Sequence, residues 1–184
     1  MNREFKSYDK YRSDYVTFQQ NPTYTVPAWL QDVRTNAKSA FDQLGFPTKI
    51  RGNEKWKYTN VRPLAGSIFE YPFNGHTEEL GKSDLESHIA SDEKWNLLVF
   101  IDGNYSPTLS SYPNNLDNIQ IENLRSALQK GGSPIENHLG RHANFKTDGF
   151  TAINTAFLDN GAYVCVPNDT AISTPVHLLF VSTQ

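Results

Sequence analysis

Aromatic side chains recur at every third or fourth position near the start of the chain. The stripe consists of Phe5, Tyr8, Tyr11, Tyr15 and Phe18. Because an α-helix completes a turn in 3.6 residues, this spacing places all five side chains on one face and predicts an amphipathic helix. Such a stripe is typical of a core or docking face rather than of a surface that stacks a cofactor. Asn21-Pro22 ends the predicted helix, since a proline disfavours the helical conformation of the residue before it.

A second amphipathic helix is expected after Pro27, because proline is favoured in the first turn of a helix. Its apolar face consists of Leu30, Val33, Ala37, Ala40, Phe41 and Leu44. Gly45 stands where many helices end in a left-handed residue, Phe46 can pack back on the last turn, and Pro47 prevents continuation. We therefore interpret residues 45–47 as a helix terminator.

The segment 48–75 is rich in glycine and proline and is long for a connector. Its candidate anchors are the apolar and aromatic side chains Trp56, Tyr58, Leu64, Ile68 and Phe69. In one interpretation these side chains anchor the connector to the two helices. In the other, Trp56, Tyr58 and Arg62 form a partner-docking surface, because Trp, Tyr and Arg are the usual hot-spot residues of protein interfaces.

Shorter elements follow, and strands gather late in the chain. After a short helix between Thr77 and Ile89, we expect strands at 97–101, 105–109, 119–121, 162–166 and 175–182, and helices at 124–130, 134–141 and 150–157. Asp102-Gly103 marks the turn of a hairpin, and the last two strands are expected to be neighbours in one sheet. The fold class is therefore α+β, with a helical N-terminal part leading into a β part.

Composition excludes several function classes. The 184 residues include 17 Lys and Arg and 20 Asp and Glu, for a net charge of −3. No cluster of Lys and Arg stands out in the sequence, which argues against a dedicated nucleic-acid surface. The apolar runs are of strand length, too short to span a membrane, and the start of the chain lacks the apolar stretch of a signal peptide. With one cysteine, no internal disulfide can form. We expect a cytoplasmic protein.

Three motifs with possible chemistry are weak. Gly81-Lys82-Ser83 resembles the end of a phosphate-binding loop, but His76 occupies the position of the required first glycine. His138 and His142 are four apart, which would place two imidazoles on one helix face and could ligate zinc, although HExxH and a third ligand are missing. Cys165 alternates with Val164 and Val166 in a predicted strand and is interpreted as a structural residue. No residue has the setting of a catalytic group, so we expect no enzyme and no metal site.

Three ordered blocks of sequence point to a family. Residues 45–48 (GFPT) are followed closely by 54–64 (EKWKYTNVRPL), then by a hairpin at 100–105 (FIDGNY), and then by 152–157 (AINTAF). Together these blocks resemble the N-terminal region of the SufB/SufD family of iron–sulfur cluster assembly proteins, on its SufD side. The resemblance implies a non-catalytic scaffold subunit. It also implies pairing with a SufB-like subunit and a SufC-like ATPase, and a right-handed parallel β-helix core.

The resemblance also divides the chain. Residues 1–145 would form the N-terminal helical and mixed domain with the aromatic connector 48–75, and residues 146–184 would begin an incomplete β-helix core. Because the last residues look like part of a strand, we expect the chain to be the N-terminal part of a longer protein. This portion would bind no cofactor of its own, while the iron–sulfur cluster would belong to the full complex. The alternative is a standalone module that binds a protein or peptide through the helical domain and the aromatic connector.

Overall fold

The computed structural model describes residues 3–22, 24–48, 54–71, 80–89, 95–112 and 119–183. Contacts divide the chain into two compact units, and each is interrupted in sequence. Unit 1 comprises Met1–Tyr71 and Gly131–Leu158, and unit 2 comprises Pro72–Lys130 and Asp159–Gln184. These units do not coincide with the boundary expected at residue 146, and the assignment of 146–184 to a β-helix core stays a prediction.

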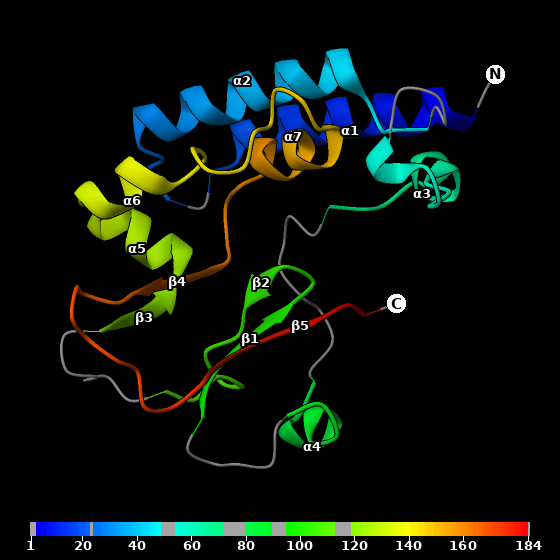
Figure 1. Cartoon of the computed structure of the whole chain (residues 1–184). Helices are drawn as coiled ribbons and strands as arrows, with labels where there is room; N and C mark the ends of the chain where they lie inside the picture. The colour runs from blue at the N-terminus through cyan, green and yellow to red at the C-terminus, as the bar shows by residue number, and fades with distance from the viewer. Residues whose placement is uncertain are drawn as a thin grey trace. The chain divides into compact units, whose positions relative to one another are not determined.

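Unit 1 is built on two long helices, α1 (Arg3–Gln20) and α2 (Ala28–Leu44), with α7 (Gly149–Ala156) packed along α2 (Figure 1). The shorter helices η1 (Glu54–Trp56), α3 (Arg62–Gly66) and α6 (Ser133–His138) complete it. Both long helices were predicted. Pro27, however, is the residue before α2 rather than part of its first turn, and Gly45 ends α2 with a φ of 61° and an N–H that donates to the Phe41 carbonyl oxygen.

The aromatic stripe of α1 packs in the core, which is one of the two roles predicted for it. Tyr8 and Tyr11 pack against Phe41 of α2, while Tyr15 and Phe18 contact Phe157 just after α7. The side chain of Phe5 lies outside the described residues. The stripe therefore packs α1 against α2 and against the residue that follows α7.

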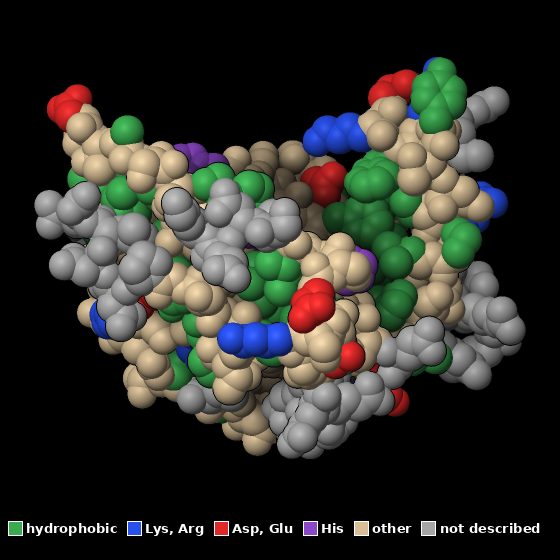
Figure 2. All heavy atoms as spheres, turned by 90° about the horizontal axis from the view of Figure 1, so that it is seen from below, with side chains coloured by type: hydrophobic (Ala, Val, Ile, Leu, Met, Phe, Trp, Pro, Cys, Tyr) green, Lys and Arg blue, Asp and Glu red, His purple; other side chains and the backbone are tan. Residues whose placement is uncertain are grey.

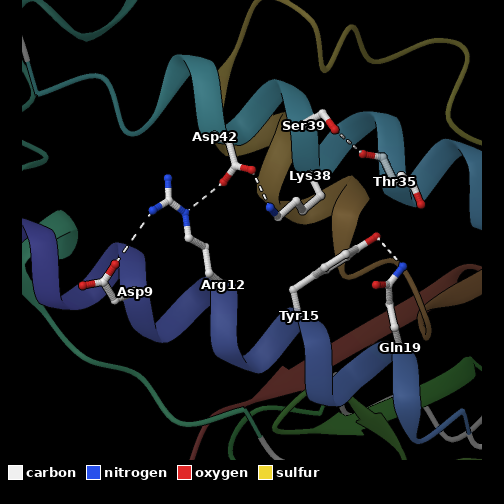
Figure 3. A network of polar contacts seen from close by, with 8 residues as sticks. All are labelled: Asp9, Arg12, Tyr15, Gln19, Thr35, Lys38, Ser39 and Asp42. Carbon is white, nitrogen blue, oxygen red and sulfur yellow. Dashed lines mark hydrogen bonds and ion pairs between the residues drawn. The ribbon is translucent and has the colours of Figure 1, made fainter.

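Polar side chains join α1 to α2 on the outside of this core (Figure 3). Arg12 of α1 donates from Nε to Asp42 Oδ1 of α2 at 3.3 Å and also lies 3.8 Å from Asp9. Asp42 in turn pairs with Lys38 one turn away on α2. Because these side chains are partly or fully exposed, the network contributes little to stability and chiefly supports the alignment of the two helices.

Unit 2 contains two small sheets and two helices among its described residues. Strand β1 (Asn96–Ile101) is buried throughout, pairs antiparallel with β2 (Asn104–Tyr105) and pairs parallel with β5 (Val176–Val181) (Figure 1). The second sheet pairs β3 (Gln120–Asn123) with β4 (Ala162–Cys165) in antiparallel register. Helices α4 (Lys82–Leu85) and α5 (Leu124–Lys130) flank these strands in sequence.

The sheet topology corrects one expectation and confirms another. β4 and β5 were expected to be neighbours, but β4 pairs with β3 and β5 pairs with β1, in separate sheets. The hairpin at Asp102-Gly103 is confirmed, since both residues have the positive φ angles, 48° and 81°, that a tight hairpin turn requires. An α+β fold is thus confirmed, whereas the described strands show no β-helix.

Candidate partner-docking surface

Three segments that are far apart in the sequence meet at one place in unit 1. They are the GFP terminator of α2, the aromatic connector and the start of α7. The closest approach is between two backbones, because a Cβ placed on Gly149 would lie 1.8 Å from the carbonyl oxygen of Gly45. Phe46 is fixed from another side, since its N–H donates to the Tyr8 hydroxyl at 2.7 Å. The backbone of Gly45 in the first sequence block thus requires glycine at residue 149, three residues before the 152–157 block.

Trp56 anchors the connector at this place. Its ring centroid lies 4.8 Å from that of Phe150 in α7, and Phe150 lies 5.2 Å from Phe46. The Trp56 side chain is half-buried, and its indole Nε1 is buried without a hydrogen-bond partner among the described residues. This placement favours the anchoring interpretation for Trp56.

Tyr58 and Arg62 are placed differently, because both point to solvent. Tyr58 is 92% exposed, and the Lys57 ammonium lies 5.5 Å from its ring centroid. Arg62 begins α3, where its N–H donates to the Asn60 side-chain oxygen at 3.2 Å, and its side chain is exposed. We call Tyr58 and Arg62, with the exposed lysines Lys55 and Lys57, the connector surface. Its role in docking is not tested by the structure and stays a prediction.

A small pocket of about 250 Å³ lies beside Trp56 and shares one residue, Lys55, with the connector surface. Its polar lining includes Lys55 of the connector and Asp148, the residue before α7. Asp148 accepts from the backbone N–H of Thr151 at 2.9 Å, and this bond is the main reason that the pKa of its carboxyl lies below the ordinary value of 3.8. The carboxylate is therefore engaged in capping α7 rather than poised as a general base.

The other motifs with possible chemistry, around Gly81 and Cys165, have structural roles. The N–H of Gly81 donates to Asp84 Oδ2 at 2.7 Å, so residues 81–83 begin the short helix α4; His76 lies outside the described residues. Cys165 is half-buried on β4 on the side opposite the exposed Val164, as the alternation predicted. Burial, and after it a hydrogen bond with Cys165, raise the pKa of Tyr163 to about 12. Within the described part of the chain, no three His, Cys, Asp or Glu side chains gather as a metal site would require.

Sequence reasoning missed a buried arginine. Arg34 of α2 is 5% exposed, donates from Nε to the Leu158 carbonyl oxygen at 2.7 Å, and lies over the Phe18 ring at 4.8 Å. Its position in the sequence indicates this burial, because Arg34 lies four residues after Leu30 and seven before Phe41, on the apolar face of α2. Arg34 thus links both long helices to the chain that leaves α7.

One face of the molecule can be inspected for clusters of charge. On the face in Figure 2, lysine and arginine side chains stand apart from one another among acidic and polar residues, and hydrophobic side chains reach the surface in several places. Exposed large hydrophobic residues include Ile68 and Phe69 near the connector surface and Phe180 of β5. Among the described helices, none combines the length and the apolar character needed to cross a bilayer.

The chain belongs to a known class of protein. Residues 5–178 match the family model described as the SufBD protein N-terminal region, so the chain belongs to the SufBD family. It is similar to an iron–sulfur cluster assembly SufBD family protein of Synechocystis sp. (strain ATCC 27184 / PCC 6803 / Kazusa), with 27% identity over 161 residues. The match covers 86% of this chain and 34% of that relative, so the chain spans about a third of the relative's length.

Proposed function

We propose that the chain is the N-terminal portion of a SufD-like, non-catalytic scaffold subunit in iron–sulfur cluster assembly. The observation that carries this proposal is the family match over residues 5–178, together with the similarity to the Synechocystis iron–sulfur cluster assembly protein. In this proposal a SufB-like subunit and a SufC-like ATPase are the partners. The cluster belongs to the full complex, and this portion holds no cofactor.

The proposed β-helix core would lie downstream of the helical domain. Support comes from the parallel pairing of β1 with β5, since a parallel β-helix is built from parallel neighbours. On β5, Leu178 and Phe180 are exposed on one face. Further strands of a longer protein would cover that face.

Within the scaffold, we assign partner docking to the connector surface. The Tyr58 ring is 92% exposed, and the Lys57 ammonium lies 5.5 Å from its centroid. Lys55 and Arg62 are exposed cations within four residues of Tyr58 in the sequence. An aromatic residue among cations suits an acidic partner surface, because charge complementarity steers association and the aromatic ring supplies buried area. Trp56 is the support of this surface rather than a part of its exposed face.

The test uses the full-length protein with its SufB-like partner from the same organism. We expect Tyr58→Ala and Arg62→Ala each to weaken binding by about tenfold or more, as interface hot spots do. Lys146→Ala is the matched control, because Lys146 is an exposed cation of the same unit outside the connector surface. If the variants bind like the parent while the complex still forms, the connector surface is excluded and the scaffold proposal stands. Failure of the complex to form at all would contradict the scaffold proposal itself.

The second candidate is a module that binds a protein or peptide on its own. The exposure of Tyr58 favours it equally, because a docking surface needs no scaffold core. Binding of the same partner to residues 1–184 alone, with the affinity of the full-length protein, would favour the module. Binding that requires the longer protein would favour the scaffold.

A further inference from the structure

Two histidines outside the connector surface lie together on unit 1. Nδ1 of His138 is 3.0 Å from Nε2 of His142, and the two ring centroids are 5.3 Å apart with nearly parallel planes. Both side chains are exposed. The sequence had suggested that one helix would present the pair, but α6 ends at His138 and His142 follows a tight turn.

The turn between the two histidines is fixed by its own hydrogen bonds. The Leu139 N–H donates to the Ile135 carbonyl oxygen at 2.9 Å, and the Arg141 N–H donates to the His138 carbonyl oxygen at 3.2 Å. The Arg141 side chain also donates from Nε to the Glu136 carbonyl oxygen at 3.1 Å. These bonds fix the backbone between the two histidines, and the hydrogen bond between the rings holds the imidazoles at their observed separation.

Gly140 allows this turn to pack closely against α2. Its φ of 73° lies in the left-handed region that favours glycine, and a Cβ there would lie 2.9 Å from Cγ1 of Val33. The turn therefore rests directly on a long helix of the core. The imidazole pair is consequently attached to a rigid element, as a preorganised binding site requires.

The separation of the two nitrogens suits a metal ion. Nitrogens bound at about 2.0–2.1 Å from one ion, at roughly a right angle, lie about 2.9 Å apart. In the structure the 3.0 Å between His138 Nδ1 and His142 Nε2 is a hydrogen bond between the two rings, and an ion bound at adjacent positions would hold the same nitrogens at almost the same separation. Imidazole ligands suit late first-row ions, and affinity rises along the series to Cu²⁺.

We propose that His138 and His142 form a two-imidazole chelate for a late first-row divalent ion, with Cu²⁺ bound most tightly and Ni²⁺ and Zn²⁺ less so. When the ion binds, it replaces the hydrogen bond between the rings. The proton of that bond moves through water to the other nitrogen of its own ring, so each neutral ring gives one lone pair to the ion, from Nδ1 of His138 and from Nε2 of His142. No third side-chain ligand gathers with them among the described residues, so water completes the coordination. Neither the docking nor the scaffold proposal is needed for this inference.

The test is titration of the untagged 184-residue chain with Cu²⁺, followed by calorimetry and electron paramagnetic resonance. We expect one Cu²⁺ per chain and a spectrum with splitting from two nitrogens. His138→Ala and His142→Ala should each weaken binding by about tenfold or more and remove the two-nitrogen pattern. His88→Ala, which removes an exposed histidine of unit 2, should change neither quantity.

Circular dichroism of each variant shows whether the fold is kept, and replacement of either exposed histidine should keep it. The double variant His138→Ala/His142→Ala decides the assignment. If it binds Cu²⁺ with the same stoichiometry and affinity as the parent, the ion is held elsewhere and the proposal is wrong. Absence of any one-to-one binding by the parent chain would also overturn it.

Discussion

Gly45 and Gly149 show how single residues determine the meeting of distant segments. Neither glycine is near the other in sequence, yet the carbonyl oxygen of Gly45 occupies the space of a Cβ on Gly149. A side chain at residue 149 would therefore push α7 away from the end of α2. Because both groups are backbone, no rotation of a side chain can relieve the clash.

We expect Gly149→Ala to lower the free energy of unfolding by about 3 kcal/mol, the upper part of the range for overpacked sites. Gly66→Ala is the matched control, since a Cβ there meets nothing within 4 Å and alanine is the better helix former. Urea unfolding of both variants measures the difference. Equal midpoints for the two variants would contradict the close approach of Gly45 and Gly149.

Asp148 gives a prediction with a pH dependence. Asp148→Ala removes the cap of α7 and should cost about 1 kcal/mol at neutral pH. Because hydrogen bonding lowers the folded pKa of this carboxyl, its charge adds stability that is present above the ordinary value of 3.8. That contribution is lost as the pH falls through the lowered folded value.

The stability difference between the parent and Asp148→Ala should thus shrink in strongly acidic solution. Chemical unfolding at a series of pH values measures it. Asp32→Ala is the control, because Asp32 is an exposed carboxylate of α2 for which no capping bond is seen. A difference that stays constant from neutral to acidic pH would argue against a contribution from the Asp148 charge.

At the scale of elements, the connector separates an anchor from an exposed side chain within three residues. Trp56→Ala should lower the free energy of unfolding by about 2 kcal/mol, less than a fully buried tryptophan costs, because the side chain is half-buried against Phe150. Tyr58→Ala should stay within about 0.5 kcal/mol of the parent. Thermal unfolding compares the two. A Tyr58→Ala variant as unstable as Trp56→Ala would mean that Tyr58 is packed and would remove it from the connector surface.

The elements that sequence predicted well are those whose signals are local. The apolar face of α2 and its terminator at Gly45 lie within a few turns of each other, and β1 is a buried run between polar residues. The end of α6 was less predictable, because Leu139 and Gly140 leave the helix through a turn that is supported by Val33 of α2. That support comes from another part of the chain, and no pattern near residue 140 reports it.

The pairing of the strands and the placement of the connector surface depend on contacts between distant segments, which local sequence patterns do not encode. β5 pairs with β1 through Val176 and Asn96, and β4 pairs with β3 instead of β5. Likewise, the motif around Trp56 could be located in the sequence, whereas its contact with Phe150 could not. That contact makes Trp56 the anchor of the connector, while Tyr58 is exposed.

At the scale of the whole molecule, each compact unit is made from two separate stretches of chain. Unit 1 needs both Met1–Tyr71 and Gly131–Leu158, and unit 2 needs both Pro72–Lys130 and Asp159–Gln184. A single cut therefore cannot release either unit intact. The fragment 1–130 loses α7 from unit 1 and both β4 and β5 from unit 2.

We expect the fragment 1–130 to lack a cooperative thermal transition, because α2 loses its α7 partner and β1 loses its parallel neighbour. Circular dichroism during heating measures this, with the 184-residue chain as the reference. A sharp transition in the fragment would show that one unit is stable without its second stretch of sequence.

The two-stretch arrangement also bears on how the protein is made. On the ribosome, α1 and α2 emerge long before α7, which completes the core of unit 1 only near Leu158. The 87 residues between Tyr71 and Leu158 take about 4–17 s to synthesise at typical elongation rates of 5–20 residues per second. During this interval Tyr15 and Phe18 of α1 lack their contacts with Phe157, and Phe46 lacks its contact with Phe150. The nascent chain therefore presents a substrate for holding chaperones, and slower translation of residues 72–158 would lengthen that exposure.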